Sequence, residues 1–367
     1  MRPKSLVPTL SLLVCFGCTE AGPAGPEGGL DIAASLTASP ATLAAPVFDL
    51  APSPDGSLLA GETFVGITEL RKGGTDAVSS LAGVTGIAAI GRGDMMAVTG
   101  APFAPFLEPN ARKLFRVSSG NARLIADLGA YEDANNPDQV WNTGPPDSNP
   151  FNVAGLNGGA VLVADAAAND ILMVDGNGSI DWVAVLTPQL VSTAPFKALI
   201  GCPGSGAPEC GLPAAIPAQP VATSIAIGPD GAWYAGELTG FPGAPGMSRI
   251  WRIAAGSRHV LCPSSACTLA ASGLTSIVDL EFGANGSLYV AELDADSWLA
   301  VEIKSGGGPL TPSAGGTVKE CNVSTGVCAV IASGLALPSA LAVDKAGQLW
   351  VAENDAIPGV AHVHTVN

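Results

Sequence analysis

The sequence predicts an all-β protein, a six-bladed β-propeller of four-stranded antiparallel blades, and three observations support this prediction. One strand–turn–strand phrase recurs six times, the composition disfavours long helices, and further short strands lie between the copies. Each copy has an apolar segment, a polar turn with a glycine, and a second apolar segment that usually ends in an acid. A repeat of this kind indicates one architectural unit used several times.

The turns of the six copies define the expected blades. Their glycines lie about 58 residues apart on average, whereas a four-stranded blade needs roughly 40–50 residues, so we assign the excess to loop insertions. Segments 113–117, 171–175 and 249–253 are typical hairpin partners. Closing the ring hides long sheet edges. Five or seven blades are the nearest alternatives. The six glycines are Gly56, Gly93, Gly159, Gly231, Gly286 and Gly347.

The bulk composition agrees with this fold. The chain has 367 residues, of which 47% are hydrophobic and 13% charged, and its 46 glycines and 30 prolines favour turns over long helices. Its 32 acidic and 16 basic residues give a net charge of −16. Such a surface repels phosphate backbones, so nucleic acid is not an expected partner. It suits an exported protein or one that meets cations.

The first 18 residues resemble a bacterial export signal. Two basic residues precede a short apolar core, which is too short to span a bilayer permanently. The core ends in a segment that resembles a lipobox, with Cys18 as the lipidated residue, and Thr19 resembles the outer-membrane sorting pattern. An ordinary secretory signal is the alternative. Both place the protein outside the cytoplasm, as an outer-membrane-anchored or secreted protein that meets the membrane only through its anchor.

Residues 19–45 are rich in Ala, Gly, Pro, Thr and Ser, which predicts a flexible linker before a propeller over residues 46–367. The cysteines beyond the signal form three local pairs, which in an exported chain predict disulfides. A zinc site is the alternative, but no histidine lies near any pair. Each short loop closure is worth about 2–3 kcal/mol. The pairs are Cys202–Cys210, Cys262–Cys267 and Cys321–Cys328.

A candidate metal site follows from propeller geometry. The innermost strand of each blade lines the axial channel, and the position seven residues before each turn glycine should face its mouth. Three of these positions carry oxygen ligands, Asp49, Asn152 and Asp279, on blades one, three and five. Such a set suits Ca²⁺ or Mg²⁺. The alternative is that these side chains cap strand starts and hold channel water. The other three positions are Gly86, Ser224 and Ala340.

Two further groups of acids are candidates. The acid that closes the phrase, at Glu62, Asp165, Glu237, Glu292 and Glu353, recurs with the repeat and therefore favours a structural task such as accepting backbone N–H groups from the next blade. Loop 132–138 and segment 165–170 are dense in oxygen ligands, and ordinary Asx turns are the alternative. As ligand residues on one propeller face we single out Asn149, Asp165, Asn169, Asp170 and Glu237.

Several segments carry a family resemblance. Residues 126–138, residues 147–153 with 163–170, and residues 228–242 resemble signatures of the ScyD/ScyE family, bacterial exported β-propellers. The resemblance covers nearly all of residues 46–367, and the three cysteine-bearing segments depart from it as local insertions. It implies no particular reaction. The channel set is more distantly similar to the SMP-30/gluconolactonase propellers, and to six-bladed propellers of NHL type, in that a channel metal there polarises a lactone carbonyl.

Other chemistries find no signature. Only three histidines exist, no Gly-x-Ser-x-Gly elbow precedes a helix, and no Gly-rich run leads into a Lys-bearing helix. We therefore expect no catalytic residues that can be named and no certain cofactor. The expected function is binding or scaffolding through a propeller face, as a monomer whose partner is a small molecule, a glycan or a protein. The alternative is a metal-dependent lactonase or esterase that uses the channel cation, and a third option is a glycan-binding surface protein.

Overall fold

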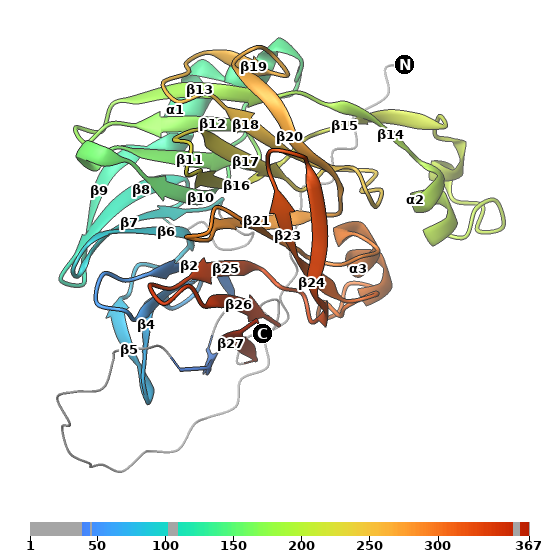
Figure 1. Cartoon of the computed structure of the whole chain (residues 1–367). Helices are drawn as coiled ribbons and strands as arrows, with labels where there is room; N and C mark the ends of the chain where they lie inside the picture. Colours follow the sequence, from blue (N-terminus) through green and yellow to red (C-terminus); the bar gives the residue numbers. More distant parts are fainter. Residues whose placement is uncertain (1–38, 45, 102–108, 355–359, 367) are drawn as a thin grey trace.

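The computed structural model describes residues 39–44, 46–101, 109–354 and 360–366, which include all six expected blades. The export signal with Cys18 and most of the expected linker lie outside the described residues. Six sheets stand around a common axis, and the inner strands of successive blades contact one another until the ring closes (Figure 1). The six-bladed propeller is therefore confirmed.

Each blade is an antiparallel meander that begins on its innermost strand. Blade one is β2 (Val47–Pro52), β3 (Leu58–Glu62), β4 (Gly66–Arg71) and β5 (Gly74–Ser79). Blade two is β6 (Val84–Gly91), β7 (Asp94–Thr99), β8 (Lys113–Ser118) and β9 (Asn121–Asp127). Blade three is β10 (Pro150–Gly155), β11 (Val161–Asp165), β12 (Asp170–Val174) and β13 (Ile180–Leu186), extended by β19 (Val260–Cys262), which pairs in parallel with β13.

The second half of the ring repeats the pattern. Blade four is β16 (Ala222–Ile227), β17 (Trp233–Glu237), β18 (Ser248–Ile253) and β20 (Cys267–Leu274). Blade five is β21 (Ile277–Phe282), β22 (Leu288–Glu292), β23 (Gly316–Asn322) and β24 (Val327–Leu335). Blade six is β25 (Ala340–Val343), β26 (Leu349–Glu353) and β27 (Ala361–Thr365), completed by β1 (Ala41–Leu43) from the other end of the chain.

The closing strand corrects the expected domain boundary. Residues 41–43 fall inside the segment predicted as linker, yet they pair antiparallel with β27. Three residues are too short for a periodicity signal, and only the open edge of β27 makes them a strand. The propeller therefore includes residues 41–43, which lie before the expected boundary at residue 46.

The turn glycines explain why the repeat is recognisable in the sequence. All six have positive φ, from 63° at Gly93 to 100° at Gly56, in the region where other residues are strained. Each sits in or next to the turn that joins the first two strands of its blade. Between successive blades, apolar side chains form a separate cluster at each of the six interfaces.

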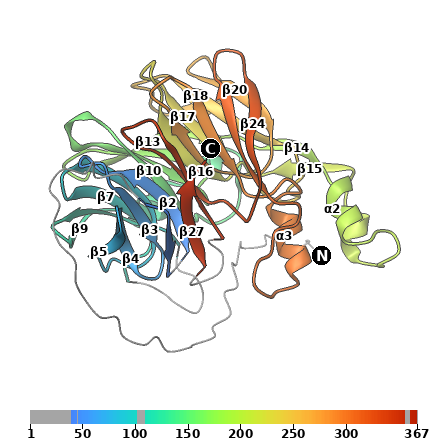
Figure 2. The ribbon, with the colours of Figure 1, turned by 60° about the horizontal axis from the view of Figure 1, so that its bottom comes forward.

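Helical elements lie in the insertions between strands. The helix α1 (Leu128–Asn135) and the 3₁₀ turn η1 (Pro137–Val140) join blades two and three, and a second 3₁₀ turn, η2 (Asn157–Gly159), lies within blade three. A hairpin of β14 (Gln189–Ser192) and β15 (Ala215–Ala218) carries α2 (Ala194–Leu199) and η3 (Pro208–Gly211) away from the ring. There α2 lies beside α3 (Trp298–Ser305), as Figures 1 and 2 show.

The three expected disulfides are present, Cys202–Cys210 in the projecting hairpin, Cys262–Cys267 between β19 and β20, and Cys321–Cys328 across β23 and β24. Two of them close short loops inside one insertion or blade. The third, Cys262–Cys267, joins the added strand of blade three to the outer strand of blade four and so links two neighbouring blades. None of the helices in the described part of the chain is long and apolar enough to cross a membrane.

Candidate functional site

The six channel positions expected from the turn glycines are equivalent in the structure. In five blades the inner strand has a register shift at its second residue, and the channel residue follows directly after it. The three candidate metal ligands among them, Asp49, Asn152 and Asp279, line one axial cavity of about 260 Å³. Sequence reasoning therefore located these three residues in one place.

Hydrogen bonds to the adjoining blade engage each of these side chains. The Ile87 N–H donates to Asp49 Oδ2 (2.6 Å), the Ile225 N–H donates to Asn152 Oδ1 (3.0 Å), and the Leu341 N–H donates to Asp279 Oδ2 (2.7 Å). All three donors lie on the inner strand of the next blade. The second carboxyl oxygen of Asp279 accepts a further hydrogen bond, from the Leu280 N–H (2.8 Å). These contacts match the structural alternative, in which the side chains cap strands.

The three even blades use the opposite kind of contact. Thr85 Oγ1 donates to the Pro150 carbonyl (2.7 Å), Thr223 Oγ1 donates to the Ile277 carbonyl (2.7 Å), and Ser339 Oγ donates to the Val47 carbonyl (2.5 Å). Each carbonyl belongs to the inner strand of the following blade. Six interblade contacts therefore form a closed ring in which carboxyl or amide acceptors alternate with hydroxyl donors. We call these contacts the interblade ring.

On the odd blades, the residue at each register shift, which has no partner on the neighbouring strand, is apolar. Phe48 on blade one and Phe151 on blade three bring their ring centroids within 5.6 Å, although blade two separates their strands. Both precede a channel residue by one position, and neither lines the cavity. The pair therefore lies at the strand-start end of the channel, and the acidic cavity opens beyond it.

One further channel residue escaped the sequence analysis. The position two residues after each channel residue is alanine in five blades, at Ala51, Ala88, Ala154, Ala226 and Ala342, and glutamate in the sixth, at Glu281. Glu281 and four of the alanines line the cavity. The small alanine side chains leave room in the cavity, and Glu281 places a third carboxyl group there. Aligning the six copies by their turn glycines would have shown this departure.

The channel acids have raised pKa values. Burial, followed by the charge of Asp279, raises the pKa of Glu281 to about 8, although the Val343 N–H donates to it. Burial raises the pKa of Asp279 to about 7 against the hydrogen bonds from two backbone N–H groups. Burial and the charges of Asp279 and Glu281 raise the pKa of Asp49 well above its usual value. Among the described residues, no Lys, Arg or His lines the cavity to offset these charges.

Replacing Glu281 with alanine is expected to flatten the pH dependence of stability. A glutamate that titrates near pH 4.5 when unfolded and near 8 when folded binds its proton more tightly in the fold, so stability falls as pH rises from about 4.5 to 8. Glu281→Ala removes this loss. At pH 9 we expect its free energy of unfolding to exceed that of wild type by roughly 1–3 kcal/mol, because the side chain is partly exposed and solvent screens part of the effect. At pH 4 we expect no gain. Urea unfolding of metal-free protein across this pH range measures it, and a gain at both pH values would contradict the expectation.

The acid that closes the phrase has a structural task in four blades. The side chains of Glu62, Asp165, Glu292 and Glu353 each accept a backbone N–H from the segment that leads into their own blade, rather than from the next blade as expected. The donors are Ala44 (3.0 Å), Asn149 (2.6 Å), Thr275 (2.5 Å) and Ala336 (2.8 Å).

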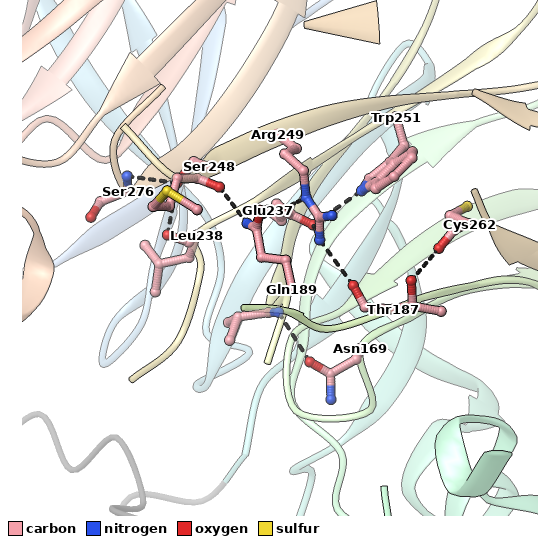
Figure 3. A network of polar contacts seen from close by, with 12 residues as sticks. Asn169, Thr187, Gln189, Glu237, Leu238, Ser248, Arg249, Trp251, Cys262 and Ser276 are labelled. Carbon is pink, nitrogen blue, oxygen red and sulfur yellow. Dashed lines mark hydrogen bonds and ion pairs between the residues drawn. The ribbon is translucent and has the colours of Figure 1, made fainter. Parts of the chain in front are cut away.

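Glu237 is the exception among these acids, because side chains bind it instead (Figure 3). The Arg249 guanidinium donates to both of its carboxyl oxygens, the Trp251 Nε1–H donates to Oε2 (3.0 Å), and Gln189 donates to Oε1 (3.3 Å). Glu237 is fully buried, and burial raises its pKa to about 7 despite these donors. Arg249 also stacks over the Trp251 ring, with 4.8 Å to the centroid, and donates to the Thr187 carbonyl (2.9 Å).

Most of the residues expected on a ligand-binding face lie in the interior of the protein. Asp165, Asn169, Asp170 and Glu237 are all fully buried, and only Asn149 is partly exposed. Asn149 itself accepts the Ala101 N–H (2.7 Å), and Asn169 accepts the Val221 N–H (3.0 Å). These side chains hold loops against blade three, because buried polar groups must find partners inside the fold. Four of the five are therefore not exposed on a propeller face.

A ready metal centre made of acids, histidines or cysteines is not found in the described part of the chain, where no three such side chains stand in a metal-binding arrangement. The channel set, with two carboxyls, one amide and the carboxyl of Glu281, has the oxygen chemistry that hard cations prefer. Three of its members, Asp49, Asn152 and Asp279, also belong to the interblade ring. Any cation there would compete with, or add to, the backbone donors.

Comparison with solved structures finds several propellers of similar fold. It is similar to a gluconolactonase from Xanthomonas campestris (TM-score 0.54, 13% identity, 90% of each chain covered). It is also similar to a putative glucose dehydrogenase from Thermus thermophilus (TM-score 0.50, 17% identity, 89% of this chain and 99% of the other) and to a putative gluconolactonase (TM-score 0.50, 12% identity, 90% and 94%). At such identities the likeness shows the fold alone. Neither a known protein family nor a curated protein matches the sequence.

Proposed function

We propose that this chain is an exported, lipid-anchored propeller of ScyD/ScyE type that works as a binding protein, and that its channel cavity takes up a divalent cation such as Ca²⁺ or Mg²⁺. The observation that carries the proposal is the acidic cavity of about 260 Å³, lined by Asp49, Asp279 and Glu281 with Asn152 and without a basic side chain among the described residues. Carboxyl groups whose pKa values are raised by burial and mutual repulsion are stabilised when a cation joins them.

Three of the cavity residues hold neighbouring blades together, and the fourth is assigned to the cation. Asp49, Asn152 and Asp279 each use an oxygen to hold the adjoining blade, so their positions are fixed before any ligand arrives. Glu281 has no counterpart on the other blades, and we assign it to cation capture. A preformed set of this kind loses little conformational entropy on binding.

The proposed location follows from the sequence and from the disulfides. We infer an oxidising compartment outside the cytoplasm, with Cys18 as the lipid anchor, because three disulfides are rarely stable in a reducing cytosol. On a propeller face, the protein would bind a partner that is a small molecule, a glycan or another protein. The chain would act as a monomer.

A metal-dependent lactonase or esterase is the second candidate function. Glu281 favours it, because a catalytic group in a repeat must differ from its copies, and Glu281 stands beside the candidate metal ligands. A bound cation would supply polarisation of the substrate carbonyl. The ionised form of Glu281, whose pKa is about 8, would accept a proton from the attacking water, so hydrolysis should rise as pH increases toward 8.

One set of measurements tests both functions on the full chain purified after export. We expect elemental analysis and Ca²⁺ titration to show a bound ion whose affinity falls at least about tenfold in Glu281→Gln and Asp279→Asn, since each removes a charged ligand. The matched control is Glu320→Gln, a partly exposed acid of β23 that does not line the cavity and should bind like wild type.

The outcomes separate the two candidates. Cation binding that depends on Glu281, without hydrolysis in a screen of lactones and esters, supports the binding protein. Hydrolysis that Glu281→Gln abolishes supports the enzyme. If neither Glu281→Gln nor Asp279→Asn changes the bound ion content or the Ca²⁺ affinity, both versions of the channel site are refuted.

A further inference from the structure

A second group of acids lies far from solvent, where loop 132–138 meets blade three. Glu132 of α1, Asp138 of η1, Asp165 at the end of β11 and Asp170 at the start of β12 are all at most 1% exposed. Asp165 and Asp170 are direct cross-strand partners, an arrangement that destabilises a hairpin when both are charged. We call these four residues the blade-three acid cluster.

Two members of the cluster have donors that explain their burial. Asp165 accepts from the Ser148 hydroxyl (2.7 Å) and from the Asn149 and Ala168 N–H groups (2.6 and 3.1 Å). Asp138 accepts from the side-chain amides of Asn142 and Asn169 (2.9 and 3.0 Å).

The other two members of the cluster have no hydrogen-bond donor. Both carboxyl oxygens of Glu132 and both of Asp170 are buried without a hydrogen-bond partner in the described part of the chain. The charged groups that act most strongly on them are the other acids of the cluster with Asp133 and Asp147, and no basic group is among these. Burial and this repulsion raise the pKa of Glu132 to about 9 and raise that of Asp170 well above its usual value.

Protonation alone does not give the carboxyl groups of Glu132 and Asp170 hydrogen-bond partners. A neutral carboxyl group gains an O–H donor that itself needs an acceptor, whereas none of the four free oxygens makes a hydrogen bond among the described residues. A buried, unpaired polar group is costly in either form. A hard cation needs only oxygen ligands and supplies the positive charge that the surrounding residues lack.

We propose that Glu132 and Asp170 bind a divalent metal ion, of the Ca²⁺ class, that fastens α1 to blade three. The two side chains offer four free oxygens, enough for two bidentate ligands, and Asp138 and Asp165 stand near them as further oxygen sources. No three acids in the described residues stand in a ready metal-binding arrangement, so Glu132 and Asp170 must move toward the ion when it binds. The site is separate from the channel and does not depend on the proposed function.

The test uses the full chain in chelator and in Ca²⁺. Thermal unfolding in 1 mM Ca²⁺ is expected to shift upward by about 5–10 °C relative to excess chelator, as for an ion that binds the folded state in the micromolar range. Glu132→Gln and Asp170→Asn should each lower the Ca²⁺ affinity at least about tenfold and reduce this shift, because each removes one of the two charged ligands. Asp133→Asn is the matched control. Asp133 is the next residue of the same helix, its side chain is 55% exposed, and it pairs with Arg112.

Further measurements distinguish this site from the channel site and from misfolding. Glu281→Gln should leave the Ca²⁺ shift of this site intact, whereas Glu132→Gln should leave the channel ion intact. Terbium, a Ca²⁺ surrogate, should show emission sensitised by the neighbouring Tyr131 in wild type, and Ca²⁺ should displace it. The proposal is wrong if Ca²⁺, Mg²⁺ and Mn²⁺ leave the melting temperature and terbium emission of wild type unchanged, or if Glu132→Gln folds and keeps the full Ca²⁺ shift.

Discussion

Replacing Arg249 with methionine is expected to destabilise the protein by about 3–5 kcal/mol at pH 8, the largest single effect among our predictions. Within the described residues, Arg249 is the only basic partner of Glu237, which is fully buried. Methionine keeps much of the apolar stem over Trp251 but removes both donors to the carboxyl group. The remaining Trp251 and Gln189 donors leave a buried charge without a counterion. Urea unfolding at pH 8 and pH 5 measures the loss.

The pH dependence identifies the cause. Without Arg249 the folded pKa of Glu237, already about 7, rises further above its unfolded value of about 4.5, so the loss should grow as pH rises through this range and shrink at pH 5. Adding Glu237→Gln to Arg249→Met should recover most of the stability at pH 8. Arg252→Met on the same strand is the matched control, because its pair with Asp230 is 40% exposed on each side and should be worth no more than about 1 kcal/mol. A loss that is equal at both pH values would contradict the explanation.

Asp279→Ala is expected to lower the free energy of unfolding by about 2–5 kcal/mol, because it leaves two buried N–H groups, of Leu280 and Leu341, without an acceptor. The second of these contacts joins blade five to blade six. The loss should therefore be larger than for Asn152→Ala, which frees one N–H group, of Ile225, at a cost of about 1–3 kcal/mol. Denaturant unfolding of the two variants at pH 8 without metal makes the comparison.

Asp279→Asn is the control that separates the hydrogen bond from the charge. Its amide oxygen can still accept from the Leu341 N–H, and the substitution removes repulsion with Asp49 and Glu281. We expect it to lose less than half of what the alanine variant loses. If both variants were equally unstable, the charge rather than the acceptor would be the stabilising element.

Much of the fold was predictable because the repeat carries its own turn chemistry. A glycine with positive φ follows each inner strand, so the six turns, the blades and the channel positions could all be counted from six residues. The disulfides were predictable from local spacing. The closing strand β1 was not, because residues 41–43 become a strand only through the edge that β27 offers. The added strand β19 depends in the same way on the edge of β13.

The position of the candidate site could be predicted from the sequence, but the contacts that its residues make could not. The offset from the turn glycines placed Asp49, Asn152 and Asp279 together, but their hydrogen bonds run to neighbouring blades, and one chain segment does not reveal what lies beside it. Glu281 was missed because each copy was searched for ligands rather than compared with its copies. Asp165 and Asp170 were expected at the surface, and sequence cannot show that α1 folds over them.

The six contacts of the interblade ring can be lost one at a time. Odd blades accept a backbone N–H from the following blade, and even blades donate a hydroxyl to a backbone carbonyl of the following blade. In both kinds of contact the partner is a backbone group, which any blade can offer whatever its side chains are. Each contact of the ring therefore depends on a single side chain, and one substitution at such a position would weaken one interface and leave the other five contacts in place.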